Sequence, residues 1–224
     1  MSLILNIDTA NEQASVSLAL EGKILAVCVN KQQKDHAAWI HPAIETLFAE
    51  SRYTTNDVKA IAVVAGPGSY TGLRVAMATA KGFCYALHLP LITLNTLGLM
   101  AYAASKEFVS GNVLLCPMLD ARRMEVYTAL YRIDLNEVLA PCAMILEPAS
   151  FDEWLSDNTV VFFGNGAGKW RALVKCSNAL FSDSDYQPSI IADLSYQQFT
   201  HVNFSDLAYS VPIYIKDFHT HHKK

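Results

Sequence analysis

The stretch AIAVVAGPGSYTGLR, residues 60–74, decides the fold. Its first six residues are apolar and include two adjacent valines, which predicts a strand buried on both faces of a sheet. Glycine, proline and hydroxyl residues at positions 66–72 then end the strand. A helix is expected from Leu73 to about Leu87. A buried strand followed by a tight loop and a helix indicates an α/β protein.

On either side of this stretch the hydrophobic pattern predicts further strands and helices. The first thirty residues alternate with a period of two, so they predict a three-stranded meander whose first strand ends at Asp8. Residues 36–50 have apolar positions at helical spacing, with Pro42 removing one backbone donor. In chain order we expect strands at 3–7, 14–20, 24–29, 60–65 and 91–94, and helices at 36–50, 73–87 and 96–104.

The same opening pattern returns in the second half of the chain. Residues 113–119 form an apolar run that ends in a carboxylate, Asp120, as the first strand ends in Asp8. We interpret this as an internal duplication of an α/β unit; the alternative is a coincidence of two ordinary hairpins. Further strands are expected at 125–132 and 138–146. The two expected lobes are residues 1–106 and 107–224.

The end of the chain gives a weaker pattern. We expect a short helix near 151–155, a strand at 160–163 and a helix from Lys169. Residues 182–198 are polar and are predicted to be irregular. The tail from 216 to 224 carries three histidines and predicts a solvated end.

Composition limits the classes of function. The chain has 224 residues, of which 52% are hydrophobic, enough for a sizeable core. A count of 17 Lys and Arg against 21 Asp and Glu gives a net charge of −4, which argues against a surface that itself binds nucleic acid. Five cysteines without close pairs predict reduced thiols that act as small core residues. Because no apolar stretch reaches about 18 residues and no leader pattern is present, we expect a cytoplasmic chain outside the membrane.

The loop at residues 66–72 is the first candidate site, because backbone N–H groups at the start of a helix attract phosphate or carboxylate. The alternative is a purely structural turn, since the loop has neither the Gly-Lys-Ser/Thr ending of the P-loop nor the glycine spacing of the dinucleotide fingerprint. Asp8 and Asp120 stand at strand ends, where α/β proteins hold cations or phosphates and where aspartates also cap turns.

The remaining candidates give no catalytic or metal site. Ser69 lacks the flanking glycines of a nucleophile elbow. His36 and His41 are five residues apart, so they do not share one helix face as metal ligands and are expected on the surface. The segment Gly164–Lys169 is followed by Trp170 instead of a hydroxyl residue, which favours a glycine turn over a phosphate loop. We therefore predict no catalytic residue and no metal ligand.

The helix at residues 73–87 has hardly any polar face. Only Arg74 and Lys81 interrupt it, and alanines and a glycine at 76, 78, 80 and 82 leave room for another helix. A helix that is apolar nearly all round must be covered on every side. We expect it to be uncovered in the lone chain and to bind a second polypeptide, with Met77 and Ala80 facing that partner. The alternative is a central helix covered by the chain's own second lobe.

Three motifs together resemble the TsaB (YeaZ) family of bacterial accessory subunits: residues 66–74, Ile7–Ala10, and Asp120–Arg122 running into Glu125–Tyr127. The resemblance extends nearly end to end. Its departures are Ala76, Arg123-Met124 and the tail at 218–222. The resemblance implies the actin-like fold of sugar kinases and Hsp70-type ATPases, with two lobes of which the second is shortened.

The resemblance also implies a non-catalytic activator. In such systems TsaD transfers threonylcarbamoyl to adenosine 37 of tRNAs that read codons beginning with A, and TsaE supplies ATPase activity. The TsaB-like subunit binds TsaD through its first two helices and forms a homodimer through the same surface when alone. The subunit contacts tRNA only as part of the complex. The implied partner surface comprises Trp39, Ile40, Ala43, Leu47, Tyr70, Arg74, Met77, Ala78 and Lys81.

The resemblance implies no cofactor of the chain's own, with ADP or ATP at the interface with the catalytic partner as the alternative. A degenerate nucleotide or anion site would comprise Asp8, Thr9, Gly66, Gly68, Ser69 and Asp120. The competing hypotheses are an actin-fold small-molecule kinase, a glycoprotease-like peptidase and a self-associating structural dimer. The absent nucleophile–base pair and the incomplete nucleotide signature argue against an enzyme.

Overall fold

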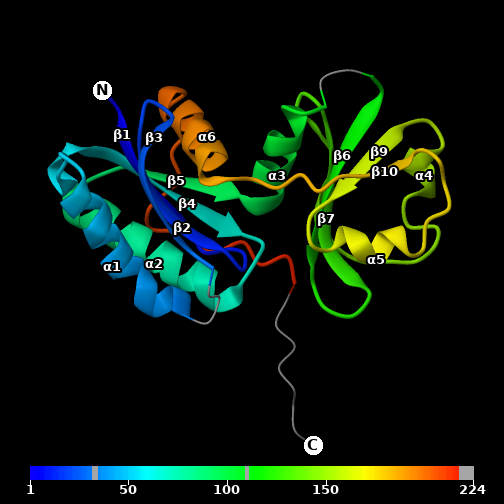
Figure 1. Ribbon diagram of the computed structural model, residues 1–224, viewed down its shortest axis with the longest axis horizontal. Helices are drawn as coiled ribbons and strands as arrows, with labels where there is room; N and C mark the ends of the chain where they lie inside the picture. The colour runs from blue at the N-terminus through cyan, green and yellow to red at the C-terminus, as the bar shows by residue number, and fades with distance from the viewer. Residues whose placement is uncertain (32–34, 109–110, 217–224) are drawn as a thin grey trace, which may run out of the picture.

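The computed structural model describes residues 1–31, 35–108 and 111–216, and it shows two lobes side by side (Figure 1). The first lobe is built on a five-stranded sheet in the order β3-β2-β1-β4-β5. Its strands are β1 (Leu3–Asp8), β2 (Ala14–Leu20), β3 (Lys23–Asn30), β4 (Val58–Gly66) and β5 (Leu91–Asn95). The predicted meander β1–β3 is antiparallel, and β4 and β5 continue the sheet in parallel with β1.

The second sheet repeats this arrangement. Its order is β10-β9-β6-β7-β8, so each of its strands takes the place of the strand five numbers earlier in the first sheet. Its strands are β6 (Val113–Asp120), β7 (Glu125–Arg132), β8 (Glu137–Ile145), β9 (Thr159–Phe163) and β10 (Ala179–Phe181). Antiparallel and parallel pairs also fall in the same places. The predicted duplication is therefore confirmed at the level of topology.

Two long helices lie side by side on one face of the first sheet (Figure 1). They are α1 (His36–Glu50) and α2 (Tyr70–Leu87), and the short 3-10 helix η2 (Thr55–Asp57) precedes β4. Pro42 lies inside α1, as expected. The start of α2 is three residues earlier than predicted, because Ser69 caps the helix and its Oγ accepts the Gly72 N–H at 3.4 Å.

Two further helices, α3 and α6, connect the two lobes. Helix α3 (Thr96–Ser105) follows the first sheet and contacts both sheets, β4 and β5 of the first and β6 and β7 of the second. Helix α6 (Pro188–Thr200) follows the second sheet and packs against β1, β2, β3 and β5 of the first. The two helices also contact each other, and Asp193 of α6 accepts a hydrogen bond from Tyr102 of α3 at 2.9 Å. The contacts of α3 and α6 therefore join the lobes.

Helix α6 corrects the expectation that residues 182–198 are irregular. The helix was missed because its fully buried face is narrow: only Ile191, Ala192 and Ser195 are buried. The expected second lobe, residues 107–224, also includes segments that the structure places against the first sheet. Besides α6, these are residues 205–213, where Ser205 N–H donates to Leu91 O at 2.8 Å and Ile213 N–H donates to Ala65 O at 2.7 Å.

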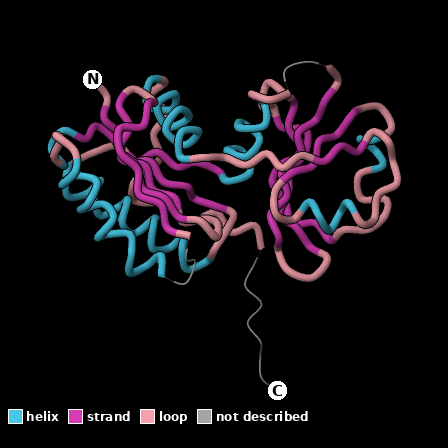
Figure 2. The backbone as a smooth tube through the Cα atoms, in the orientation of Figure 1, coloured by secondary structure: helices cyan, strands magenta, loops and turns pink. Residues whose placement is uncertain are grey.

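Besides α3, the second sheet is covered by two short helices of its own lobe (Figure 2). They are α4 (Asp152–Leu155) and α5 (Ala167–Arg171), and the latter begins two residues before the predicted Lys169. Phe151, Phe162 and Trp170 fill the core beneath them, with ring centroids 5.0–5.9 Å apart. Among the described residues, no helix is both long and apolar enough to cross a lipid bilayer.

All five cysteines are free thiols. Cys84 is buried, and its burial raises the pKa to about 12, so it serves as a small core residue. Cys116 is also buried, with its Sγ 3.3 Å from Thr128 Oγ1. Cys176 is exposed, so the expectation that the cysteines are core residues is wrong at that position.

Candidate functional site

The glycine loop between β4 and α2 docks against the loop that follows β1. Ser69 N–H donates to Ala10 O at 2.6 Å, and Thr9 Oγ1 donates to Gly72 O at 2.7 Å. A Cβ on Gly68 would lie 2.3 Å from Ala10 O, and one on Gly72 would lie 2.2 Å from Thr9 O. Real side chains do not fit at these distances, so both glycines are explained by the close approach of two backbone segments.

Asp8, at the end of β1, forms its hydrogen bonds inside the protein. One carboxylate oxygen accepts the Ala10 N–H at 2.9 Å, and the other accepts the Tyr186 hydroxyl at 2.9 Å. The Tyr186 oxygen in turn accepts from Asn11 Nδ2 at 3.0 Å. Burial raises the pKa of Asp8 to about 6, although both hydrogen bonds act in the opposite direction. The side chain thereby joins the end of β1 to the segment that leads into α6.

Asp120, the matching residue of the second lobe, is exposed and ion-paired. Its Oδ1 accepts from Lys169 Nζ at 2.8 Å and from Arg122 N–H at 2.6 Å. The hydrogen bond from Lys169 lowers the pKa of this carboxyl group. Asn165 Oδ1 accepts the Asp120 N–H at 2.8 Å, and Gly166 N–H donates to Met118 O at 3.0 Å. The Gly164–Lys169 segment therefore begins as a glycine turn, as predicted, and it continues into α5; its contact with the end of β6 was not predicted.

A cleft of about 770 Å³ lies between the two docked glycine loops. Of the six predicted anion-site residues, Gly68, Ser69 and Asp120 line it. Asp8 lies deeper, at a separate small pocket, Thr9 is fully buried, and Gly66 packs against Ile213 O. The structure thus separates three of the six predicted residues from this cleft.

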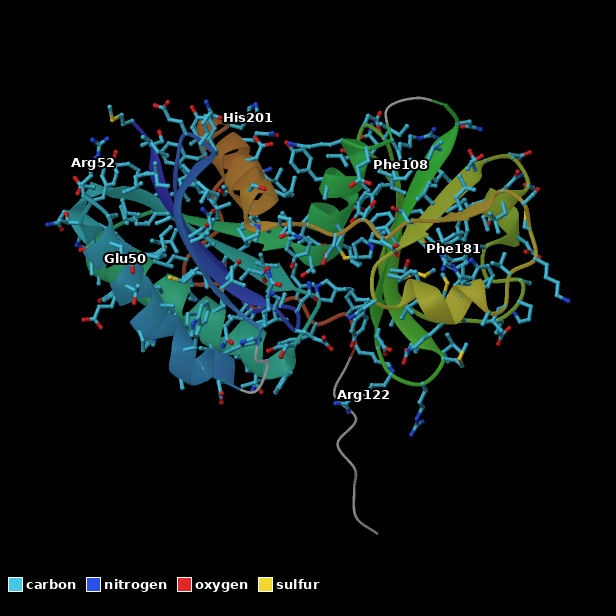
Figure 3. All side chains as sticks on the ribbon, in the orientation of Figure 1. Glu50, Arg52, Phe108, Arg122, Phe181 and His201 are labelled. Carbon is cyan, nitrogen blue, oxygen red and sulfur yellow. The ribbon has the colours of Figure 1, made fainter. Side chains whose placement is uncertain are left out.

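Residues that the sequence did not assign complete the cleft wall. They include Asn11, Glu12, Arg122, Tyr127 and Asn165. Arg122 lies on the turn between β6 and β7, with its φ at +70°, and Figure 3 shows it near the opening between the lobes. The volume lies in the range of small-ligand pockets, and the wall offers hydroxyl, amide and charged groups to a polar ligand. Within the described residues no group of three His, Cys, Asp or Glu side chains is arranged to hold a metal ion.

One side of helix α2 remains exposed. Met77 is 3% exposed and Ala80 0%, because both pack into the core between α2 and the sheet. The expectation that these two residues face a partner is therefore wrong. The outer side of the helix is formed by Thr71, Arg74, Ala78, Gly82, Tyr85 and Ala86, which are exposed. We call this set the α2 outer face.

Burial also corrects the predicted contribution of α1. Ile40, Ala43 and Leu47 are buried against the sheet, so they belong to the core and not to an exposed surface. Trp39 is half-buried at the edge of this helix. The surface implied by the resemblance thus included positions on the side of α1 that packs against the sheet.

The two histidines of α1 differ in environment. His36 is buried, with its Nε2 3.3 Å from Asn11 O, so its expected surface position is wrong. His41 is exposed, and its Nε2 lies 3.5 Å from Thr79 Oγ1. The histidine-rich tail, residues 217–224, lies outside the described residues.

The two basic residues of α2 hold the end of the chain. We call residues 205–216 the C-terminal strap. Arg74 Nε donates to the Tyr214 hydroxyl at 2.9 Å, and the Arg74 guanidinium lies over the Tyr70 ring. Lys81 Nζ donates to Ala208 O at 3.1 Å and to Ser210 O at 3.0 Å. Further along, Lys216 pairs with Glu125 of the second lobe.

The fold is that of a two-lobed α/β protein of the actin-like class. Its two sheets have the same strand order, the first strand of each ends in a carboxylate, and helices α3 and α6 connect the lobes. The TsaD family, described as tRNA N6-adenosine threonylcarbamoyltransferase, matches residues 23–214. A TsaB protein of Bacillus subtilis (strain 168) is 30% identical over 179 residues, which cover 77% of this chain and 75% of that protein.

Two further relatives cover almost the whole chain. The tRNA threonylcarbamoyladenosine biosynthesis protein TsaB of Escherichia coli (strain K12) is 29% identical over 224 residues, covering 96% of this chain and 94% of that protein. The solved structure of YeaZ from Pseudomonas aeruginosa superposes with a TM-score of 0.73 at 26% identity, covering 96% of this chain and all of that one. The chain belongs to the TsaB (YeaZ) family.

Proposed function

We propose that this chain is a non-catalytic subunit that binds a TsaD-like threonylcarbamoyltransferase and activates it for the modification of adenosine 37 in tRNAs that read codons beginning with A. The names of its relatives support the broader statement that the chain takes part in tRNA threonylcarbamoyladenosine biosynthesis. A TsaE-like ATPase is a further member of this proposed complex, and tRNA is bound by the complex as a whole. The observation that carries the proposal is the α2 outer face.

The α2 outer face is suited to contact with another helix. Ala78 and Gly82 are four residues apart and both exposed, and a Cβ built on Gly82 meets nothing within 4 Å. Small residues at this spacing let a second helix backbone approach closely. The match of the TsaD family to residues 23–214 supports a partner with the same fold, whose corresponding helices could pack against α1 and α2. A second copy of the chain offers the same helices, so self-association should compete with partner binding.

The environments of the candidate chemical groups support a non-catalytic role. Asp8 is buried and bonded to Ala10 and Tyr186, and Asp120 is paired with Lys169. The glycines of the first loop are explained by its docking against Thr9 and Ala10.

The rival proposal is a small-molecule kinase or a peptidase. Titration of the lone chain with ATP and magnesium distinguishes them, because micromolar binding with turnover would support the kinase.

The decisive experiment compares two neighbouring substitutions on α2. Ala78→Glu places a carboxylate on the exposed side, so the chain should remain folded, while the charge would be buried without a partner in the complex. We expect affinity for the TsaD-like subunit to fall about 100-fold or more and tRNA modification to be lost in a reconstituted reaction. Met77→Glu should instead unfold the chain, because Met77 lies in the core.

Ala172→Glu is the matched control, because Ala172 is exposed on the second lobe. This variant should bind and support modification as the unsubstituted chain does. If folded Ala78→Glu protein still co-elutes with the TsaD-like subunit and supports full modification, the proposed interface is wrong.

A further inference from the structure

We propose that the C-terminal strap forms the second half of the surface that binds the TsaD-like partner, with Tyr209 and Val211 as contact residues and Lys81 as the residue that positions them. This inference rests on the function proposed above. It assigns a role to a segment that is separated from α2 in sequence by more than a hundred residues, and it changes the role expected for Lys81 from direct contact to positioning.

The strap presents apolar side chains on both of its sides. Leu207, Ile213 and Ile215 are partly buried and pack against the core clusters. Tyr209 and Val211 point the other way, with 84% and 66% of their surface exposed. Residues 206–210 form a turn, in which Ser210 N–H donates to Asp206 O at 3.0 Å, and exposed turns usually carry polar side chains. Large apolar residues there indicate a surface that another molecule covers.

The strap follows α2 in the opposite direction. It begins beside β5, where Ser205 bonds to Leu91 near the end of α2, and it reaches Ala65 through Ile213 near the start of α2. Lys81 Nζ donates to the carbonyl oxygens of Ala208 and Ser210, the residues on either side of Tyr209. Asp206 Oδ1 holds the turn internally by accepting the Ala208 N–H at 2.8 Å and the Tyr209 N–H at 3.0 Å, and Lys81 fixes this turn against α2.

The exposed aromatic residues of the strap and of α2 meet around Lys81. Tyr85 is 78% exposed and lies four residues after Lys81, one helical turn along the same side of α2. Tyr85 therefore lies beside Ala78 and Gly82 of the α2 outer face, and the turn that carries Tyr209 is bound at Lys81, the neighbour of Gly82. Tyrosine is enriched among the residues that contribute most to binding energy in protein interfaces.

The occupant we assign to this surface is the TsaD-like subunit. Its family matches residues 23–214 of this chain, so it would bring helices of the same arrangement to the small residues of α2. Tyr85 and Tyr209, which both lie on the Lys81 side of α2, would then contact one flank of the packed helix. A second copy of this chain is the alternative occupant, and the experiment below distinguishes the two.

The test uses the full-length chain and measures its Kd for the TsaD-like subunit and its own self-association. Tyr209→Ala should weaken partner binding at least about tenfold without changing the unfolding transition, because Tyr209 is exposed. Lys81→Met should also weaken binding of the TsaD-like subunit, and it should accelerate amide hydrogen exchange at residues 206–211. Lys81→Arg, which can still donate two hydrogen bonds, should restore most of the affinity and the protection.

Lys175→Met is the control, because Lys175 is exposed on the second lobe. If Tyr209→Ala binds the TsaD-like subunit normally while Ala78→Glu does not, the strap inference fails and the proposed function stands. If neither substitution matters, both fail. Loss of self-association with unchanged partner binding would assign the strap to a second copy and overturn the inference.

Discussion

The two lobes share a sheet and differ in what covers it. Both have five strands in the same order, and in both a glycine-containing turn docks beside the end of the first strand. The first lobe, however, carries helices of 15 and 18 residues, α1 and α2, whereas those of the second, α4 and α5, have 4 and 5 residues. The sheet topology was conserved between the two halves of the molecule, and the helices were not.

This difference explains why the proposed partner surface belongs to the first lobe. A helix of 18 residues has one side for the core and enough length for a second, exposed side of several turns. A helix of 5 residues is little more than one turn, and α5 uses it to bury Trp170 beneath Phe151 and Phe162. The second lobe thus closes its own core, while the first keeps an outer helix face available.

The largest expected effect comes from the matched glycines of the two lobes. Gly72→Ala should lower the free energy of unfolding by at least about 3 kcal/mol, because the new Cβ would meet the backbone oxygen of Thr9 at 2.2 Å. Gly166→Ala should lower the free energy of unfolding by less, since the new Cβ would lie 2.9 Å from Val126 Cγ1 and no closer than 3.1 Å to the backbone of residues 119 and 120. Denaturant unfolding of both variants measures the difference.

Gly82→Ala is the control for these two variants. Gly82 lies inside α2 with open space around it, so alanine should raise stability by about 0.5 to 1 kcal/mol through its better helix propensity. An equal loss in the free energy of unfolding for Gly72→Ala and Gly82→Ala would show that the docking of the first loop does not constrain the fold.

A smaller effect is expected from Asp8. Its folded pKa of about 6 lies above the ordinary value of 3.8, so the folded protein holds a proton that the unfolded chain releases between about pH 4 and 6. Stability therefore falls as the pH rises through this window, by up to about 3 kcal/mol. Asp8→Asn lacks this ionisation, so the stability of the variant relative to the unsubstituted chain should rise from pH 4 to pH 7. A difference that stays constant with pH would contradict the buried position of this carboxyl group.

The lobes also show where sequence patterns were sufficient. Strand periodicity, the carboxylates at strand ends and the glycine loops are local features, and they predicted the meander, the duplication and the turn at Gly164 correctly. The partner surface was predicted less well, because the choice of Met77, Ile40 and Leu47 depended on which side of each helix faces the sheet. The almost uniformly apolar sequence of α2 does not contain that information, whereas the helical spacing of apolar residues in α1 already places Ile40 and Leu47 on the side that faces the sheet.

Other features could not be predicted because they depend on contacts between distant segments. The narrow buried face of α6 is explained only by the first sheet on which it packs. Likewise, Arg74 and Lys81 interrupt an apolar helix in the sequence. Their role, which is to bind the C-terminal strap, depends on a segment more than a hundred residues away. His36 is buried because its Nε2 lies against Asn11 O, a contact across 25 residues.

The smallest expected effect, of opposite sign to that of Asp8, comes from its counterpart Asp120. The pKa of Asp120 is lowered by Lys169, so the folded state favours the charged carboxylate; this stabilisation is present above the ordinary value of 3.8 and is lost as the pH falls through the folded pKa. The Asp120 side chain is 44% exposed, so solvent screens the pair. Asp120→Asn should cost less than about 1 kcal/mol at pH 7, and the cost should shrink in high salt and at acid pH. Lys169→Met, measured in parallel, should show the same dependence on salt. A large, salt-independent loss of stability for Asp120→Asn would contradict the exposed, solvent-screened position of this ion pair.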